Sequence, residues 1–250
     1  MTNKMTHTKI LALIPARMGS SRFPGKPMEK ILGKPMIGHV YEQVIKSSLL
    51  HMSAVATCDK IIFDYIESLG GVAVMTSNMH ERASDRCAEA LLKLEELHNI
   101  KYDIVVMIQG DEPMIHPDMI GEAVFPMLND KNIKVVNLLG EVEDDDEFRS
   151  KNTIKVVCDL KMNAMYFSRE AIPTNASNSI GKQICVIPFK RDFLLDYTNL
   201  TPTPLEEAES IDMLRVLEHG FKVHMKPTKH SSHAVDTKED LKLVEKLMKK

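Results

Sequence analysis

The sequence has few cysteines, no long apolar run and no excess of positive charge. Its four cysteines lie far apart and form no C-x-x-C pair, which argues against a zinc site or a disulfide framework. The apolar run from Ile10 to Ile14 is too short for a membrane span or a secretory segment. The net charge of -3 disfavours a protein that holds nucleic acid mainly through a basic field. We therefore expect a soluble, cytoplasmic protein with no nucleic-acid or membrane partner.

The composition is that of an ordinary globular protein. Of the 250 residues, 44% are hydrophobic and 27% are charged, which leaves enough apolar material for a sizeable core. The length suits one large domain, or one domain with a small lobe. No internal repeat is visible, and no linker is long enough to separate two independent domains.

Short apolar runs alternate with helical patterns over the first 140 residues. The expected strands are 9–15, 53–57, 72–75, 103–109 and 134–139, and the expected helices are 36–50, 61–69, 84–97 and 118–128. This alternation indicates βαβ units and a mostly parallel sheet covered on both faces. Ligands of such sheets bind beyond the carboxyl ends of the strands. The loops after Ile14, Thr57, Met75 and Gln109 should therefore share one cleft.

The pattern changes from about Glu141. The acidic run 143–147 is typical of a solvated surface loop, and residues 206–218 fit one helix. Thr237 and Asp240 fit a capping pair that opens a C-terminal helix. Further strands are expected at 155–158, 165–168 and 184–188. Four histidines lack the spacing of a helical metal site and are expected in surface or loop roles: His219, His224, His230 and His233.

A basic loop follows the first expected strand and reads Arg17-Met-Gly-Ser-Ser-Arg-Phe-Pro-Gly-Lys26-Pro. Its glycines and serines let backbone amides approach an anion, while Arg17, Arg22 and Lys26 supply three cations. A solvated basic turn is the alternative, but the position at a strand end favours nucleotide phosphates. The loop matches neither the Walker A pattern nor the dinucleotide Gly-x-Gly-x-x-Gly pattern.

Two aspartates are candidate metal ligands. Asp111 follows the strand at 103–109, where a carboxylate can hold Mg2+ beside substrate phosphates. A turn aspartate that caps the next element is the alternative. Asp236 lies far along the chain and is either a simple helix-start residue or the second carboxylate that a phosphate-bridging metal requires.

Several motifs together resemble one enzyme family. They are Ile14-Pro-Ala-Arg-Met-Gly-Ser-Ser-Arg-Phe-Pro-Gly-Lys-Pro27, Gly33-Lys-Pro-Met-Ile37, Gly70-Gly71, Gln109-Gly-Asp-Glu-Pro113, Tyr166-Phe-Ser-Arg169, Pro204-Leu-Glu206, Leu214-Arg215 and Val235-Asp-Thr237. In this order, over nearly the whole chain, they resemble the 3-deoxy-manno-octulosonate (Kdo) cytidylyltransferases, also called CMP-Kdo synthetases.

The resemblance implies a fold, a reaction and an assembly. It implies an α/β, glycosyltransferase-A-like nucleotidyltransferase fold, with a mostly parallel central sheet and a smaller β-rich dimerisation lobe. The single domain would comprise a nucleotide-binding core (about 9–140), an acceptor-binding and dimerisation part (about 141–233) and a C-terminal helix returning to the core (234–250). The family forms homodimers. It uses CTP and Mg2+, releases pyrophosphate and activates an acidic sugar as its CMP conjugate for lipopolysaccharide biosynthesis.

The resemblance also implies roles by position. The catalytic residues would be Arg17, Lys26 and Asp111, and the magnesium ligands Asp111 and Asp236. The nucleotide-binding residues would be Pro15, Ala16, Arg17, Arg22, Lys26, Met75, Thr76, Arg86 and Gln109.

This chain departs from the family in the acceptor half. A His-x-Ser-Gly-Thr-Asp/Glu-Arg stretch of the family reads His80-Glu-Arg-Ala-Ser-Asp-Arg86 here. The loop Thr174 to Gly181 is shorter, and Gln183 replaces the histidine expected near the sugar acid. These changes have two alternative explanations. One is neutral sequence drift in a remote member of the family, and the other is an altered acceptor site. The residues expected to face a small anionic acceptor are Arg22, Arg82, Lys182, Gln183 and Glu209.

We expect a cytidylyltransferase that uses CTP and Mg2+ to activate Kdo or a related ulosonic acid. Two alternatives remain at this point. One is a cytidylyltransferase acting on a different acid, such as a small phosphonate, because an arginine fork also matches phosphonate oxygens. The other is a non-catalytic CTP-binding member of the family.

Overall fold

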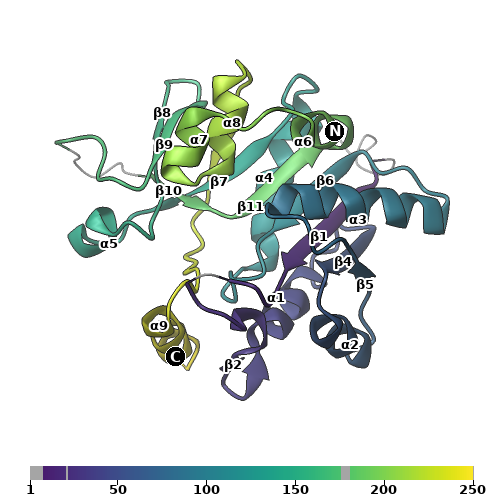
Figure 1. Cartoon of the computed structure of the whole chain (residues 1–250). Coiled ribbons are helices and arrows are strands. Elements are labelled where there is room, and N and C mark those ends of the chain that lie inside the picture. The colour runs from purple at the N-terminus through teal and green to yellow at the C-terminus, as the bar shows by residue number, and fades with distance from the viewer. Residues whose placement is uncertain (1–7, 21, 176–180, 250) are drawn as a thin grey trace.

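A five-stranded sheet lies at the centre of the computed structural model, which describes residues 8–20, 22–175 and 181–249 (Figure 1). Its strand order is β11-β6-β1-β4-β5. The strands are β1 (Ile10–Ala16), β4 (Met52–Thr57), β5 (Ala73–Met75), β6 (Ile104–Ile108) and β11 (Val186–Lys190). The first four run parallel, and β11 is antiparallel to β6. The predicted, mostly parallel central sheet is confirmed.

Helices cover both faces of this sheet because its strands are apolar on both sides. Leu11 and Leu13 of β1 pack in the cluster that contains α3 (Ala83–His98) and α6 (Arg191–Thr198). The alternate residues of β1 pack in a second cluster, which contains α1 (Met36–Val44), α2 (Lys60–Ser68) and α4 (Pro117–Asn129). The period-2 alternation of a strand thus supplies both layers of the core.

A second five-stranded sheet has the order β12-β7-β10-β8-β9. Its strands are β7 (Val136–Glu141), β8 (Lys155–Cys158), β9 (Ala164–Ser168), β10 (Gly181–Ile184) and β12 (His224–Pro227). The sequence grouped the strand at 134–139 with the first sheet, but β7 pairs with β10 and β12 instead. A single residue, Cys185, separates β10 from β11, so the chain passes directly from one sheet to the other.

Two segments of the second half differ from the sequence prediction. The stretch 206–218 forms two helices, α7 (Pro204–Glu209) and α8 (Asp212–Glu218), because Ser210 between them has a left-handed φ of 52°. The acidic run is not a simple loop, since α5 (Asp145–Arg149) starts within it. Asp144 caps α5 by accepting a hydrogen bond of 2.7 Å from the Glu147 amide. A carboxylate at a helix start is stabilised by the free amides there.

The C-terminal helix α9 (Lys238–Met248) returns to the start of the chain and lies beside β2 (Lys30–Ile31) (Figure 1). β2 pairs with β3 (Lys34–Pro35), and a short 3-10 helix, η1 (Lys26–Met28), precedes the pair. The predicted capping pair of Thr237 and Asp240 opens α9. A separate apolar cluster joins α9 to the basic loop through Phe23, Ile31, Met36, Val235 and Val244. This packing brings the residues just before α9 to the loop after β1.

No helix among residues 8–20, 22–175 and 181–249 combines the length and apolar character needed to cross a bilayer.

Candidate active site

One lysine and two aspartates from three distant parts of the chain meet at the centre of the candidate site. The Lys26 Nζ donates hydrogen bonds to Asp111 Oδ2 at 2.7 Å and to Asp236 Oδ1 at 3.1 Å. The guanidinium of Arg22 forms a second ion pair with Asp236 at 3.0 Å. Two cationic side chains therefore balance two carboxylates in this cluster, which we call the Lys26 cluster.

The backbone fixes the position of Lys26. Gly25 has a φ of 79°, which a glycine adopts without strain, and its amide donates to the Met18 carbonyl at 2.9 Å. The Met18 amide in turn donates to Asp59 Oδ2 at 2.8 Å, and Asp59 follows β4. The loop after β4 therefore supports the basic loop from behind.

The strand ends position the two aspartates. Asp111 follows β6, and its carbonyl accepts a hydrogen bond of 2.9 Å from the Val235 amide, next to Asp236. A Cβ on Gly110 would lie 3.1 Å from the Pro15 carbonyl oxygen. Gly110 thus lets the turn after β6 approach the end of β1, which brings Asp111 to the basic loop.

The cluster keeps Lys26 charged. Burial acts to lower the pKa of Lys26, but the charges of Asp111 and Asp236 outweigh it, so the pKa is raised above its ordinary value. The side chain of Lys26 is only 11% exposed, so this charge is largely screened from bulk water. A buried cation held by two carboxylates is the electrostatic centre of the site.

A cavity of about 280 Å³ opens beside the cluster at the carboxyl ends of β1, β5 and β6. Its lining includes six of the residues expected at the nucleotide besides Lys26: Pro15, Ala16, Arg17, Arg22, Arg86 and Gln109. The predicted shared cleft is confirmed for the loops after these three strands. The loop after β4 does not line this cavity, because Asp59 faces the basic loop's backbone.

Two residues expected around the nucleotide lie outside this lining. Met75 is exposed at the end of β5, and Thr76 is buried. The Thr76 hydroxyl accepts a hydrogen bond of 2.5 Å from the guanidinium of Arg86. Thr76 therefore supports Arg86 from behind, while Arg86 reaches the cavity.

A second cavity of about 600 Å³ meets the first at Arg22, Gln109 and Asp111, which line both. It extends between the two sheets and the start of α9. The Lys26 cluster therefore lies at the border of two cavities. Such a border is where a group held in one cavity can react with a molecule held in the other.

The expected acceptor residues do not lie together. Lys182 and Gln183 line the second cavity with Arg22. Lys182 pairs with Glu147 at 2.5 Å, and the Gln183 amide donates to Asn137 Oδ1 at 2.6 Å. The acidic run, expected to be solvated, thus contributes a partner to a buried lysine.

Arg82 and Glu209 take other positions than expected. Arg82 lines the first cavity, and its guanidinium pairs with Glu206 and Asp212. Glu209 lines neither cavity: its carboxylate accepts from the Ser168 hydroxyl and the Arg169 amide, both at 2.8 Å. Ion pairing inside the second half, which sequence spacing does not reveal, decides both positions.

Arg169 lies at the site although the sequence did not predict a role for it beyond its place in the motif Tyr166-Phe-Ser-Arg169. It lines the second cavity together with Arg22. Burial lowers the pKa of the Arg169 guanidinium, and the nearby charge of Arg22 lowers it further. Three carbonyls, of Lys151, Glu209 and Ser210, hold it in place. Two neighbouring guanidinium groups favour an anion between them.

The short loop from Thr174 to Gly181, singled out as a departure from the family, includes residues 176–180. These lie outside the described residues.

Glu112 is a fully enclosed carboxyl next to Asp111. It is 3% exposed, it accepts from the Ser232 hydroxyl at 2.5 Å, and its other oxygen accepts from the Cys185 amide at 3.3 Å. Burial raises the pKa of Glu112 to about 7, and the charge of Asp111 adds to the rise while the Ser232 hydrogen bond opposes it. Glu112 ties the junction between the two sheets to the segment before α9.

A mostly parallel sheet with a basic loop after its first strand, and a cavity at the carboxyl ends of its strands, is the arrangement of a nucleotide-binding α/β protein. Comparisons with known proteins narrow this class. The cytidylyltransferase family model matches residues 11–229. The chain belongs to the cytidylyltransferase family.

Its relatives are similar over nearly their whole length. The chain is 41% identical to 3-deoxy-manno-octulosonate cytidylyltransferase of Geobacter metallireducens, over 96% of this chain and 98% of the relative. It is 40% identical to the enzyme of the same name from Trichlorobacter lovleyi, over 96% and 99%. A solved structure of CMP:2-keto-3-deoxy-manno-octonic acid synthetase complexed with CTP has a TM-score of 0.85 and 35% identity, covering 97% of this chain and 99% of that one.

The raised pKa of Glu112 predicts a pH-dependent stability. The Glu112 carboxyl has a pKa of about 7 in the folded chain, compared with 4.5 for an ordinary glutamate. Protonated Glu112 therefore stabilises the folded state fully below pH 4.5, and this contribution is lost as the pH rises through 7. We expect the free energy of unfolding of the wild type to fall by roughly 2 to 3 kcal/mol between pH 5 and 8, relative to Glu112→Gln. Urea unfolding of both proteins across this range measures the difference, and parallel curves would contradict the assignment.

Proposed function

We propose that this chain transfers the cytidylyl group of CTP to Kdo, with release of pyrophosphate. The single observation that carries the proposal is the Lys26 cluster at the border of two cavities, in a chain whose relatives bear the name of this activity. The first cavity would hold CTP and the second would hold the acid.

Four free cysteines suit a reducing compartment, so we also propose a cytoplasmic location, which recovery from another cell fraction would contradict.

The first cavity suits a nucleoside triphosphate. Arg17 and Arg86 line it opposite the Lys26 cluster, and the Arg17 guanidinium donates to the His80 carbonyl at 3.3 Å. Cations around a cavity at the carboxyl ends of parallel strands are suited to phosphate oxygens. Arg17 and Lys26 would neutralise the charge that develops on the leaving pyrophosphate.

The residues around Lys26 fit a magnesium ion. Asp111 and Asp236 direct carboxylate oxygens at one cation, the Lys26 ammonium. Oxygen ligands that converge on a positive charge, next to a site for phosphates, are what Mg2+ requires. Asp111 and Asp236 would hold the ion. When bound, Mg2+ would neutralise phosphate oxygens and make the α-phosphorus more electrophilic.

In the proposed reaction, the C2 hydroxyl of Kdo attacks the α-phosphorus of CTP. The new bond joins that hydroxyl oxygen to phosphorus while the hydroxyl proton is released to solvent. The bond from the α-phosphorus to the bridging oxygen breaks, and pyrophosphate leaves on the opposite side. Arg17 and Lys26 hold the triphosphate, and Arg22 and Arg169 hold the acid. Positioning and charge neutralisation supply most of the rate enhancement in such transfers.

The carboxylate of Kdo explains the arginine pair in the second cavity. Arg22 and Arg169 both line it, and each guanidinium has five N–H donors, more than its contacts within the chain use, so donors remain for carboxylate oxygens. A small phosphonate matches the same fork, but a cavity of about 600 Å³ is large for so small an acid. The names of the relatives also favour Kdo over a phosphonate.

We expect the purified protein to release pyrophosphate with CTP and Kdo, and much less with UTP, ATP or GTP in place of CTP. Asp111→Asn removes one negative charge from the Lys26 cluster, so we expect turnover to fall by about 100-fold or more without loss of the fold. A coupled pyrophosphate assay measures both.

The control for this experiment is Asp64→Asn. Asp64 pairs with Lys60 on the surface of α2, away from the cluster, and its loss should leave turnover unchanged. Near-normal turnover of Asp111→Asn would remove Asp111 from the mechanism. CTP binding without turnover on any acid would instead support a non-catalytic member of the family.

A second prediction concerns acceptor binding. Arg169→Lys keeps a positive charge but loses the planar fork, so we expect the KM for Kdo to rise about tenfold while the KM for CTP changes little. Arg149→Lys is the matched control, because Arg149 pairs with Asp145 on the exposed side of α5. Steady-state kinetics with each substrate varied in turn measures both constants. An unchanged KM for Kdo would exclude Arg169 from the acceptor site.

We further propose that the chain forms a homodimer through the second sheet. Leu160 is fully exposed and Met165 is 64% exposed, and both lie in or next to the β8–β9 hairpin. Large apolar side chains exposed along one hairpin would be covered by a partner chain in such a dimer. We expect twice the chain mass by light scattering, and a monomer for Leu160→Lys. Leu97→Lys, on α3, is the control. A monomeric wild type would contradict the proposal.

A further inference from the structure

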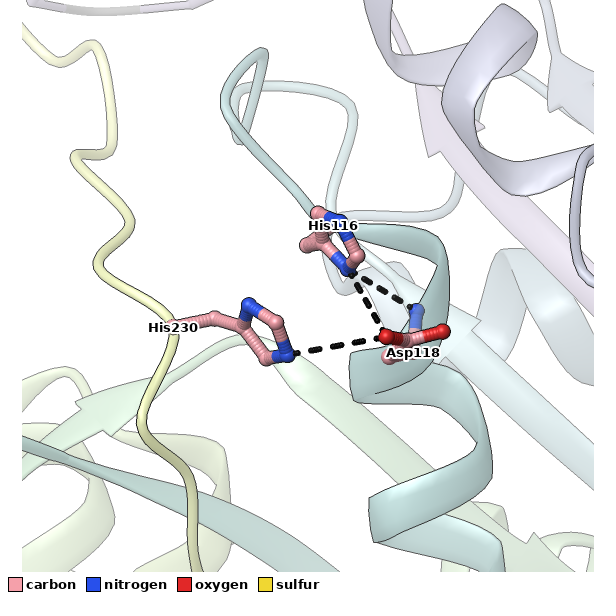
Figure 2. A group of neighbouring side chains, drawn as sticks. All are labelled: His116, Asp118 and His230. Carbon is pink, nitrogen blue, oxygen red and sulfur yellow. Dashed lines mark hydrogen bonds and ion pairs between the residues drawn. The ribbon is translucent and has the colours of Figure 1, made fainter.

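Three polar side chains outside the active site meet between α4 and the segment that follows β12 (Figure 2). They are His116, Asp118 and His230, with one ligand atom of each within 4.8 Å of the others. Asp118 Oδ2 lies 3.6 Å from His116 Nδ1 and 4.0 Å from His230 Nε2. His230 lies in a loop, as the sequence predicted, and the fold brings it to His116.

The two imidazole rings are stacked on each other. Their centroids lie 4.2 Å apart with an interplanar angle of 7°, a stacking that two imidazolium ions would resist through their like charges. His116 Nδ1 accepts a hydrogen bond of 3.2 Å from the Asp118 amide, so this nitrogen would exchange the amide for the ion on binding. Neutral imidazole nitrogens are the common ligands of zinc and related ions.

Glu122 supplies a fourth group and an independent observation. It lies one helical turn after Asp118 on α4, which places both side chains on one face of the helix. Its Oε1 is 3.9 Å from His230 Nε2, and its Oε2 is buried without a hydrogen-bond partner in the described part of the chain. A buried carboxylate oxygen without a donor is costly, and Glu122 adds negative charge beside His230.

The charges of this group favour a divalent cation. The positive end of α4 disfavours a cation close to its first turn, but Asp118 and Glu122 contribute two negative charges. Two imidazoles and two carboxylates are a donor set for zinc, whereas magnesium is bound mainly through oxygen atoms. The ligands match a site distinct from the Lys26 cluster in chemistry as well as in position.

We propose that His116, Asp118 and His230, with Glu122 beside them, form a second metal site that binds a zinc-like divalent ion. Tetrahedral zinc with bonds of about 2.0 to 2.1 Å holds its ligand atoms roughly 3.4 Å apart. The present spacing requires a small closure, in which the half-exposed His116 ring would exchange its hydrogen bond with the Asp118 amide for the ion. The proposal is independent of the cytidylyl-transfer reaction.

An ion in this site would join α4 to the segment between β12 and α9. His230 lies six residues before Asp236, and His116 lies five residues after Asp111. Hydrogen bonds from Ser232 to Glu112 and from Val235 to Asp111 already link these two segments. The ion would add a third link at their far end, and would hold the segment that carries Asp236 against the turn that carries Asp111.

The test is a zinc titration of the full chain, followed by competition with a zinc-binding dye, with CTP and Mg2+ present to occupy the other site. We expect one zinc per chain. His116→Asn and His230→Asn should each weaken zinc binding at least tenfold, since a ligand is lost. Asparagine keeps the N-terminal cap of α4 at position 116, so that variant should fold, and an unchanged melting temperature without zinc would verify this.

Two controls make the result specific. His98→Asn changes an exposed histidine at the end of α3 and should leave zinc affinity unchanged. Asp111→Asn should also bind zinc as the wild type does, because Asp111 is not a ligand of this site. Absence of zinc binding, equal binding by the wild type and both histidine variants, or a loss confined to Asp111→Asn would each overturn the proposal.

Discussion

The active site depends on the neutralisation of two carboxylates by one buried ammonium. Asp111 and Asp236 lie on segments that are far apart in sequence, and Lys26 holds both within hydrogen-bond distance. Without a cation between them, two partly buried carboxylates would repel each other. Their convergence therefore requires a positive charge at all times. In the proposed enzyme, a bound magnesium ion would share this role with Lys26 and the arginines of the basic loop.

The two-sheet architecture places this charged cluster between two cavities. The first sheet ends in the loops that line the smaller cavity, and the second sheet forms a wall of the larger one. Cys185 is the one residue between β10 and β11, so the two sheets are joined by a very short connection. Glu112 bonds to the Cys185 amide and to Ser232, so the junction, the turn after β6 and the segment before α9 are one connected unit. A rigid border of this kind suits a reaction between two bound substrates.

In the acceptor half, residue spacing did not predict where the charged side chains lie. Arg82 and Glu209 were expected to face the acceptor, but Arg82 pairs with Glu206 and Asp212, and Glu209 holds Ser168 and Arg169. Charged side chains near a site form ion pairs with the opposite charges that the fold places beside them, and these pairs set their positions. Arg169 reaches the cavity for the same reason, because backbone carbonyls and Glu209 orient it. The acidic run likewise became a helix start that pairs with Lys182.

The sequence by itself determined the strands of the central sheet, three strands of the second sheet (β7, β8 and β9), most of the helices and the basic loop with its two candidate aspartates, but it did not predict β2, β3, β10 or β12. The predicted elements follow from local periodicity, from turn residues and from the rule that parallel strands end at one edge. Only the tertiary structure decided that β7 belongs to the second sheet, that Arg82 serves the first cavity, and that His230 lies beside His116. Those outcomes depend on contacts between residues far apart in the chain. Such contacts are selected by packing and charge pairing, which no local pattern of residues encodes.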